Sequence, residues 1–251
     1  MFKYIVAAIS LGAISLGAAA IIVRYRYNKN KRERLPNKIK SVEAATKRKI
    51  VFLVSEKEKT KSYPPGYVYA LKDYDEFYKY YQGIKSEPID FVVSGFGGAA
   101  LYADVYANII YHHHDARTIV PTYAFSAMTI IALSSKCTMM NNTSSLSPID
   151  SQLYYQIDEK NNDAFSVNDI LVDTKIRNTY HAFVQQRAKM EKEKNELHMR
   201  KYVSCDDNIV NAFCSKYTHN FTFDKQFLTE LGIKIHDIPQ EILDLFYEVI
   251  L

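Results

Sequence analysis

The chain has 251 residues, of which 47% are hydrophobic and 24% charged, and its formal net charge is +4. This length allows one sizeable domain with an appendage, and the composition is that of a globular protein. Residues 24–49 carry 11 Lys and Arg against two Glu, so the rest of the chain is acidic. A nucleic-acid-binding surface over the whole protein is therefore not indicated.

The three cysteines, Cys137, Cys205 and Cys214, show no CxxC spacing. An odd number without paired spacing argues against a disulfide framework and a zinc site, and a reducing compartment is the simpler interpretation. Residues 112–115 (HHHD) also predict no metal site, since adjacent residues on a helix point in different directions. We expect no metal and no other cofactor.

The N-terminal segment Tyr4–Val23 is uncharged and apolar. As a helix rising about 1.5 Å per residue it spans roughly the 30 Å hydrocarbon core of a bilayer. A cleaved signal peptide is the alternative, but this run exceeds a typical h-region of about 7–15 residues. We expect a retained transmembrane helix within residues 1–23. Because positive charge follows it, the main domain is expected on the cytoplasmic side.

Residues 24–48 are polar and basic and contain Pro36. They predict a juxtamembrane linker whose Lys and Arg side chains attract anionic lipid. Residues 49–251 then form the main domain.

Apolar runs and helical spacings alternate along this domain. Residues 89–93 are apolar without alternation, as in a buried parallel strand. The order predicts an α/β fold with right-handed crossovers. The expected strands are 49–54, 89–93, 119–123 and 137–140, and the expected helices are 73–83, 99–112 and 127–133. Beyond residue 166 the pattern is mostly helical, with one or two long helices over 167–202 and shorter ones at 206–212 and 240–250.

Two sharp strand-to-helix corners lie close together in this pattern. The first, residues 89–99 (IDFVVSGFGGA), offers bare backbone N–H groups at Gly97 and Gly98. The second, residues 118–128 (TIVPTYAFSAM), places the Ser126 hydroxyl at the start of a helix. An oxyanion-binding loop beside a serine nucleophile has this form. The alternatives are a tight turn at the glycines and an N-cap serine.

The chain contains, in order, four longer stretches: SEPIDFVVSGFGGAALYADVYANII, PTYAFSAMTIIALSSKCTMM, SSLSPIDSQL and CSKYTHNFTF. Together they resemble the serine dehydrogenase proteinase family, a membrane-anchored relative of Clp-type protease subunits and signal peptide peptidase A. The resemblance extends from about residue 49 to 235. It implies a Clp protease/crotonase-like spiral of ββα units, preceded by one N-terminal transmembrane helix.

The resemblance also implies a Ser–Asp–His triad in that chain order. Ser126 matches the nucleophile, Asp150 the acid and His219 the base. The backbone N–H groups that match the oxyanion hole are those of Gly97, Gly98 and Ala127. Without the resemblance, Asp150 is equally well interpreted as a loop cap and His219 as a surface residue.

The sequence departs from the family pattern beside the proposed site. Phe96 replaces the usual proline of the glycine loop, and Ala127-Met128 stands where Gly-Gly often follows the nucleophile. The residue after His219 is Asn220 where Asp is common.

Three functions compete on these residues. The leading hypothesis is a membrane-anchored serine peptidase that acts on cytosolic peptides or membrane-protein tails. The departures motivate an alternative, a catalytically inactive membrane-anchored scaffold of the same fold. An acyl-CoA enzyme is disfavoured, because crotonase-type enzymes place no serine nucleophile at the second corner. The expected partners are peptide or protein substrates, membrane lipid and further copies of the chain.

Overall fold

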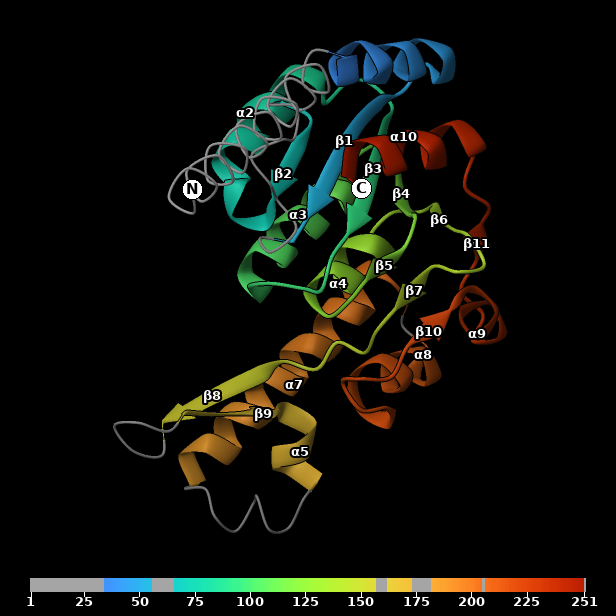
Figure 1. Ribbon diagram of the computed structural model, residues 1–251. Coiled ribbons are helices and arrows are strands. Elements are labelled where there is room, and N and C mark those ends of the chain that lie inside the picture. Colours follow the sequence, from blue (N-terminus) through green and yellow to red (C-terminus); the bar gives the residue numbers. More distant parts are fainter. Residues whose placement is uncertain (1–33, 56–65, 157–161, 173–181, 205, 251) are drawn as a thin grey trace, which may run out of the picture.

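The computed structural model describes residues 34–55, 66–156, 162–172, 182–204 and 206–250. A six-stranded sheet with helices on both faces forms the body, and an arm extends from one end of it (Figure 1). The transmembrane helix expected within residues 1–23 lies outside these ranges. In the part of the chain that is described, no helix combines the length and apolar character needed to cross a membrane.

The main sheet is parallel, as the apolar runs predict. Each pair of neighbouring strands runs in the same direction, and β1 pairs with β3 along its whole length, from Lys49 opposite Ile89 to Val54 opposite Ser94. The strands follow the order β11-β6-β4-β3-β1-β2. Their bounds are β1 Lys49–Val54, β2 Val68–Ala70, β3 Ile89–Ser94, β4 Ala116–Val120, β6 Thr138–Met140 and β11 Ile235–His236.

Both faces of this sheet are buried, which explains why its strands lack polar alternation. On β1, Val51 and Leu53 join one hydrophobic core, and Phe52 joins a second core on the opposite face. The first core is completed by α2 Tyr74–Ile84, α3 Ala100–His112 and α4 Ala127–Leu133, with the short 3-10 helix η1 Leu71–Asp73 before α2. The second core is covered by α10 Gln240–Ile250 and by a helix that includes residues 34–46.

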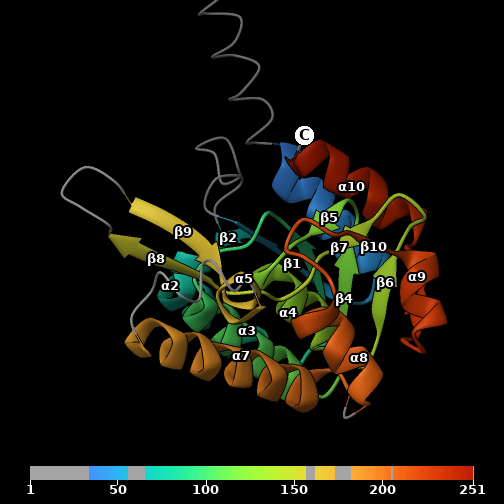
Figure 2. The same cartoon turned by 90° about the horizontal axis from the view of Figure 1, so that it is seen from below.

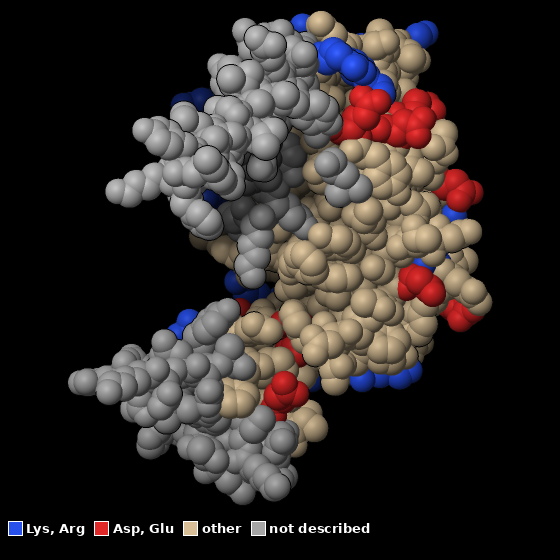
Figure 3. All heavy atoms as spheres, in the orientation of Figure 1, with Lys and Arg blue, Asp and Glu red and all other residues tan. Residues whose placement is uncertain are grey.

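Residues 34–46 pack against the sheet and belong to the domain, although the sequence predicts a linker there. Leu35 and Ile39 are buried one helical turn apart, and Lys38 forms an ion pair with Glu248 of α10. Basic and acidic side chains accordingly meet near the top of the face in Figure 3. Two apolar positions four residues apart make one stripe of an otherwise basic helix, and the high charge of the segment conceals that stripe in the sequence.

A second, three-stranded sheet begins where the expected strand 119–123 is interrupted. β4 ends at Val120, and after Pro121 the chain enters β5 Tyr123–Ala124. Proline has no N–H to donate to a sheet, so the strand breaks there. β5 pairs in parallel with β7 Ser145–Leu146, and β7 pairs antiparallel with β10 Phe223–Asp224.

The arm contains a hairpin that the sequence analysis missed. β8 Gln152–Gln156 and β9 Asn162–Ser166 pair antiparallel and lead into α5 Val167–Val172. A small core of its own joins α5 to the start of α7 Ala182–Tyr202. Figure 2 shows the hairpin projecting from the body and α7 running alongside α3, which it contacts. The remaining elements are α8 Asp207–Asn211, the π-helix η2 Ala212–Lys216 and α9 Lys225–Glu230.

Asp90, which is fully buried at the start of β3, joins the neighbouring strands electrostatically. Its Oδ1 accepts hydrogen bonds from Arg48 Nε at 2.6 Å and from Arg117 Nε at 2.7 Å. The Asp90→Asn variant leaves two guanidinium groups facing a neutral amide, so we expect it to lose about 3–5 kcal/mol of unfolding free energy in urea titration. Asp115→Asn, at an exposed partner of Arg48, is expected to lose less than about 1 kcal/mol. Equal losses in the two variants would show that burial of the pair is immaterial.

Candidate active site

The second corner is a strained turn with Ser126 at its bend. Ser126 has φ 53° and ψ −120°, and Phe125 O accepts a hydrogen bond from Met128 N at 3.0 Å. These values are those of the first central position of a type II′ turn, where glycine is usual. A residue with a side chain held there costs about 1–3 kcal/mol. The local conformation is therefore maintained by its surroundings.

Backbone hydrogen bonds place the first corner directly against the second. Gly95 N donates to Tyr123 O at 3.0 Å, and Phe125 N donates to Gly95 O at 2.8 Å. Because β3 and β4 are parallel neighbours, both corners lie at the same carboxyl edge of the sheet. Residues 97 and 126, which are far apart in sequence, are brought into contact in this way.

Gly97 is required by this close approach. Its φ is +116°, and a Cβ added to it would lie 3.0 Å from Ser126 Cβ. The glycine therefore lets the loop backbone pass immediately beside the nucleophile candidate. Gly97 does lie in a tight turn, as the alternative interpretation has it, and this turn brings the loop backbone into contact with Ser126.

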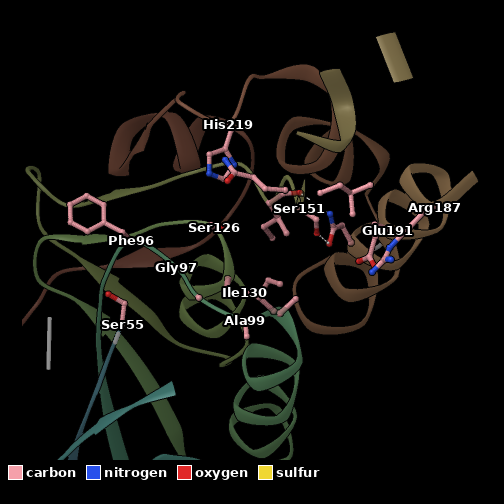
Figure 4. A pocket seen from close by; sticks show the side chains of 17 residues that line it. Ser55, Phe96, Gly97, Ala99, Ser126, Ile130, Ser151, Arg187, Glu191 and His219 are labelled. Atoms are coloured by element: carbon pink, nitrogen blue, oxygen red, sulfur yellow. Dashed lines mark hydrogen bonds between the residues drawn. The ribbon is translucent and has the colours of Figure 1, made fainter. Parts of the chain in front are cut away.

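Ser126 does not act as a helix cap, although it occupies the N-cap position of α4. Its side chain makes no capping hydrogen bond. Ser126 instead lines a cavity of about 580 Å³ together with Gly97, Gly98 and His219, and Figure 4 shows Ser126, Gly97 and His219 around it. The alternative interpretation of Ser126 as an ordinary N-cap is therefore not supported by the geometry.

The backbone donors around this cavity differ in their availability. Ser126 N is occupied, because it donates to Ser147 Oγ at 2.7 Å. Among the residues that the structure describes, the N–H groups of Gly97, Gly98 and Ala127 have no hydrogen-bond acceptor. All three of these residues line the cavity. Unoccupied backbone donors at the edge of a cavity are a feature that an oxyanion hole requires.

Asp150 is buried between the body and the arm. The residue is only 2% exposed, and its Oδ1 accepts a hydrogen bond from Asn168 N at 3.2 Å. Burial raises the pKa of Asp150, against the opposing effects of hydrogen bonds from Ser166 and Asn168 and of the nearby His219. The Asn168 bond agrees with the loop-cap interpretation, while the electrostatic effect of His219 places the two side chains in the same region.

His219 lies in a turn after η2 and lines the same cavity as Ser126. Its loop is held by aromatic packing, with the Tyr217 and Phe221 rings stacked at a centroid distance of 4.2 Å. In the described part of the chain, the buried His219 Nδ1 has no hydrogen-bond partner, and neither does the buried Asp150 Oδ2. No hydrogen bond within that part joins His219 to Ser126 or to Asp150.

Helix α7 supplies one wall of the cavity, which the sequence analysis did not predict. Arg187, Glu191 and Asn195 follow at four-residue intervals, so they share one face of the helix. Asn195 is buried and donates from Nδ2 to Ile149 O at 3.2 Å, while Ser151 Oγ donates to its Oδ1 at 3.2 Å. Asn195 is therefore hydrogen-bonded to the residues on both sides of Asp150, Ile149 and Ser151. The helical spacing of these polar residues was the available signal.

Phe96, the residue that departs from the family pattern, lies at the rim of the cavity. It is 58% exposed and its ring centroid lies 4.6 Å from that of Tyr123. Its side chain packs along the outside of the corner, away from Gly97 (Figure 4). The large side chain is therefore accommodated without filling the space beside Ser126.

Comparisons with known proteins identify a family for this chain. The chain matches the model of the ClpP-like SDH-type serine proteinases over residues 19–249. Over 70 residues it is 39% identical to an uncharacterized protein of Methanocaldococcus jannaschii, a match that covers 28% of this chain and only 24% of that protein's length. Similar solved structures include ClpP1 from Listeria monocytogenes, with 10% identity and a TM-score of 0.46 over 76% of this chain and 91% of that chain. A mutant of a membrane-bound stomatin-specific protease has 18% identity and a TM-score of 0.45 over 80% of this chain and 84% of that chain.

The contact between the two corners predicts the effect of a single methyl group. Gly97→Ala should lower the free energy of unfolding by about 1–3 kcal/mol, because the new Cβ meets Ser126 and the positive φ is unfavourable. Gly83→Ala is the matched control, since that glycine lies within α2 and an added Cβ meets no atom within 4 Å. It should stabilise by about 0.5–1 kcal/mol. Urea titrations that give both variants the same sign would contradict the contact.

Proposed function

Since the chain belongs to the family of ClpP-like SDH-type serine proteinases, we propose that it hydrolyses peptide bonds with Ser126 as the nucleophile. The observation that carries the proposal is that Ser126 has a strained backbone, makes no helix-capping hydrogen bond, and lines one cavity with His219 and the glycine loop. Residues other than glycine with a strained backbone tend to cluster at functional sites, where the surrounding structure holds the strained conformation in place.

His219 would act as the general base. A serine hydroxyl becomes an effective nucleophile when a base removes its proton as it attacks the carbonyl carbon. An imidazole can accept that proton near neutral pH and later return it to the leaving amine. The negative oxygen of the tetrahedral intermediate would then be bound by the free backbone donors of the cavity: Gly97, Gly98 and Ala127.

Asp150 would orient the imidazole and stabilise its protonated form. The support lies in two buried atoms, Asp150 Oδ2 and His219 Nδ1, which have no partner within the described residues. A buried polar atom without a hydrogen bond costs stability, and a contact between these two would satisfy both. We therefore place His219 between Asp150 and Ser126 when the site is engaged with substrate.

The substrates would be peptides or protein tails near a membrane. The apolar segment Tyr4–Val23 and the basic residues after it support a single-pass anchor with the domain on the cytoplasmic side. The order β4, β5, α4, with the two strands in different sheets, supports the ββα spiral of the crotonase-like fold.

Self-association is also part of the proposal. Three apolar side chains at seven-residue intervals along α7 are largely exposed: Phe183, Met190 and Leu197. They form one stripe on the side of the helix that faces away from its buried residues. A further copy of the chain is the partner that the family context favours.

The second candidate is an inactive scaffold of the same fold. The observation in its favour is that no hydrogen bond among the described residues joins Ser126, His219 and Asp150. The two candidates differ in one measurable property, the reactivity of Ser126.

A fluorophosphonate probe should label the full-length protein in detergent or membranes. The Ser126→Ala and Ser126→Gly variants should not be labelled, because both lack the nucleophilic oxygen. Ser126→Gly should also exceed Ser126→Ala in unfolding free energy by about 1 kcal/mol, since glycine relieves the positive φ. A folded wild-type protein that resists labelling would favour the scaffold.

Asp150→Asn should separate function from stability. Because burial raises the pKa of Asp150, its contribution to stability is greatest below about pH 3.8 and declines as the pH rises through the folded-state value. Asparagine does not ionise, so near pH 7 the variant should be as stable as wild type or more stable. Peptidase activity should fall by about 10⁴-fold.

Urea titrations between pH 4 and 8, paired with labelling rates, provide the measurement. A variant that loses stability at pH 7 while keeping its labelling rate would show that Asp150 serves only as a loop cap.

A further inference from the structure

A buried hydroxyl lies directly beneath the nucleophile candidate. Ser147 is 3% exposed, and its Oγ accepts the hydrogen bond from Ser126 N at 2.7 Å. The same Oγ lies 3.1 Å from Pro148 O, to which it donates its own proton. Ser147 follows β7, the strand that pairs with β5 just before the corner, so the sheet register brings it to this position.

A second hydroxyl, that of Thr129, completes the connection. Thr129 is fully buried in α4, and its Oγ1 lies 2.7 Å from Ala124 O and 3.1 Å from Ser147 O. Ser147 N in turn donates to Thr129 Oγ1 at 3.3 Å. Thr129 thus connects Ala124, which precedes the bend, to the same Ser147 that binds Ser126 at the bend.

We infer that Ser147 is a positioning residue for Ser126, an inference that rests on the proposed peptidase function. It has two effects. It binds the amide of a residue whose φ of 53° is unfavourable, and so holds the hydroxyl toward the cavity. It also occupies the Ser126 N–H, so that Ala127 and the glycine loop supply the donors for the oxyanion.

The chain offers a matched control in Ser144, three residues earlier. It is 1% exposed, and its Oγ donates to Val120 O at 2.6 Å, lies 3.2 Å from Pro121 O and accepts from Asn141 N at 3.0 Å. Ser144→Ala therefore removes a buried hydroxyl that links backbone groups, as Ser147→Ala does. In the described structure, however, Ser144 makes no hydrogen bond to the bend at residues 125–128 and does not line the cavity. Loss of stability alone should affect the two variants alike.

The test compares kcat and KM for a reporter peptide, fluorophosphonate labelling rates and urea midpoints in the full-length protein. Ser147→Ala should lower kcat and the labelling rate by roughly 10- to 100-fold, because a small displacement of a nucleophile costs about this factor. KM should change by less than about 3-fold, since the cavity lining stays in place. Ser144→Ala should leave kcat within about 3-fold of wild type despite a similar shift in urea midpoint.

Ser147→Cys is the second variant, for use if the alanine variant does not fold. A thiol is close in shape to the hydroxyl but is a weak acceptor, so kcat should again fall while the protein stays folded. Equal kcat losses in the Ser144 and Ser147 variants, or a loss confined to KM, would overturn the inference and leave the proposed function intact. Failure of the probe to label folded wild-type protein would overturn both.

Discussion

The candidate site depends on the two backbone hydrogen bonds that join Gly95 to Tyr123 and Phe125. They bring the ends of β3 and β4 so close that only glycine fits at position 97, and they carry Ser126 into a turn that a serine adopts at a cost. This constraint also decides which backbone donors remain available at the site. Because the N–H of Ser126 donates to Ser147, the backbone donors at the cavity that lack a partner among the described residues are those of Gly97, Gly98 and Ala127.

The arm forms one wall of the cavity beside this corner. Helix α7 is fixed to the body at its C-terminal end, where Tyr202 donates a hydrogen bond to Asp104 of α3 at 2.9 Å. From there it extends over the corner and places Asn195 against the segment around Asp150. One helix therefore forms a wall of the cavity and holds the segment around Asp150, so both features depend on the same packing. Removing water from this region is also what raises the pKa of Asp150.

The sequence predicts the parts of this fold in which local pattern and tertiary environment agree. Apolar runs such as Ile89–Val93 become buried parallel strands, and α4 begins and ends where expected. Ser126 and the glycine loop follow from the two corners, whereas Asp150 and His219 were reached only through a family resemblance. The β8–β9 hairpin and the helix at residues 34–46 were missed, because their burial depends on partners elsewhere in the chain. Pro121 was a local signal that the expected strand 119–123 breaks into two, and the prediction did not use it.

Each residue proposed to carry the chemistry departs from an ordinary rule of stability. Ser126 occupies a glycine conformation, Asp150 is a buried carboxyl with one oxygen unpartnered in the described structure, and His219 has an equally isolated ring nitrogen. A scaffold gains nothing from these features, since glycine at 126 and asparagine at 150 would satisfy the fold at lower cost. A nucleophile, its base and its acid need such an arrangement, because groups already satisfied by the protein have little capacity left to bind a transition state. Single features of this kind occur elsewhere, in the positive φ of Lys47 and in the buried ring nitrogens of His113 and His198 that have no partner among the described residues. Their combination around one cavity is therefore what supports the proposed peptidase.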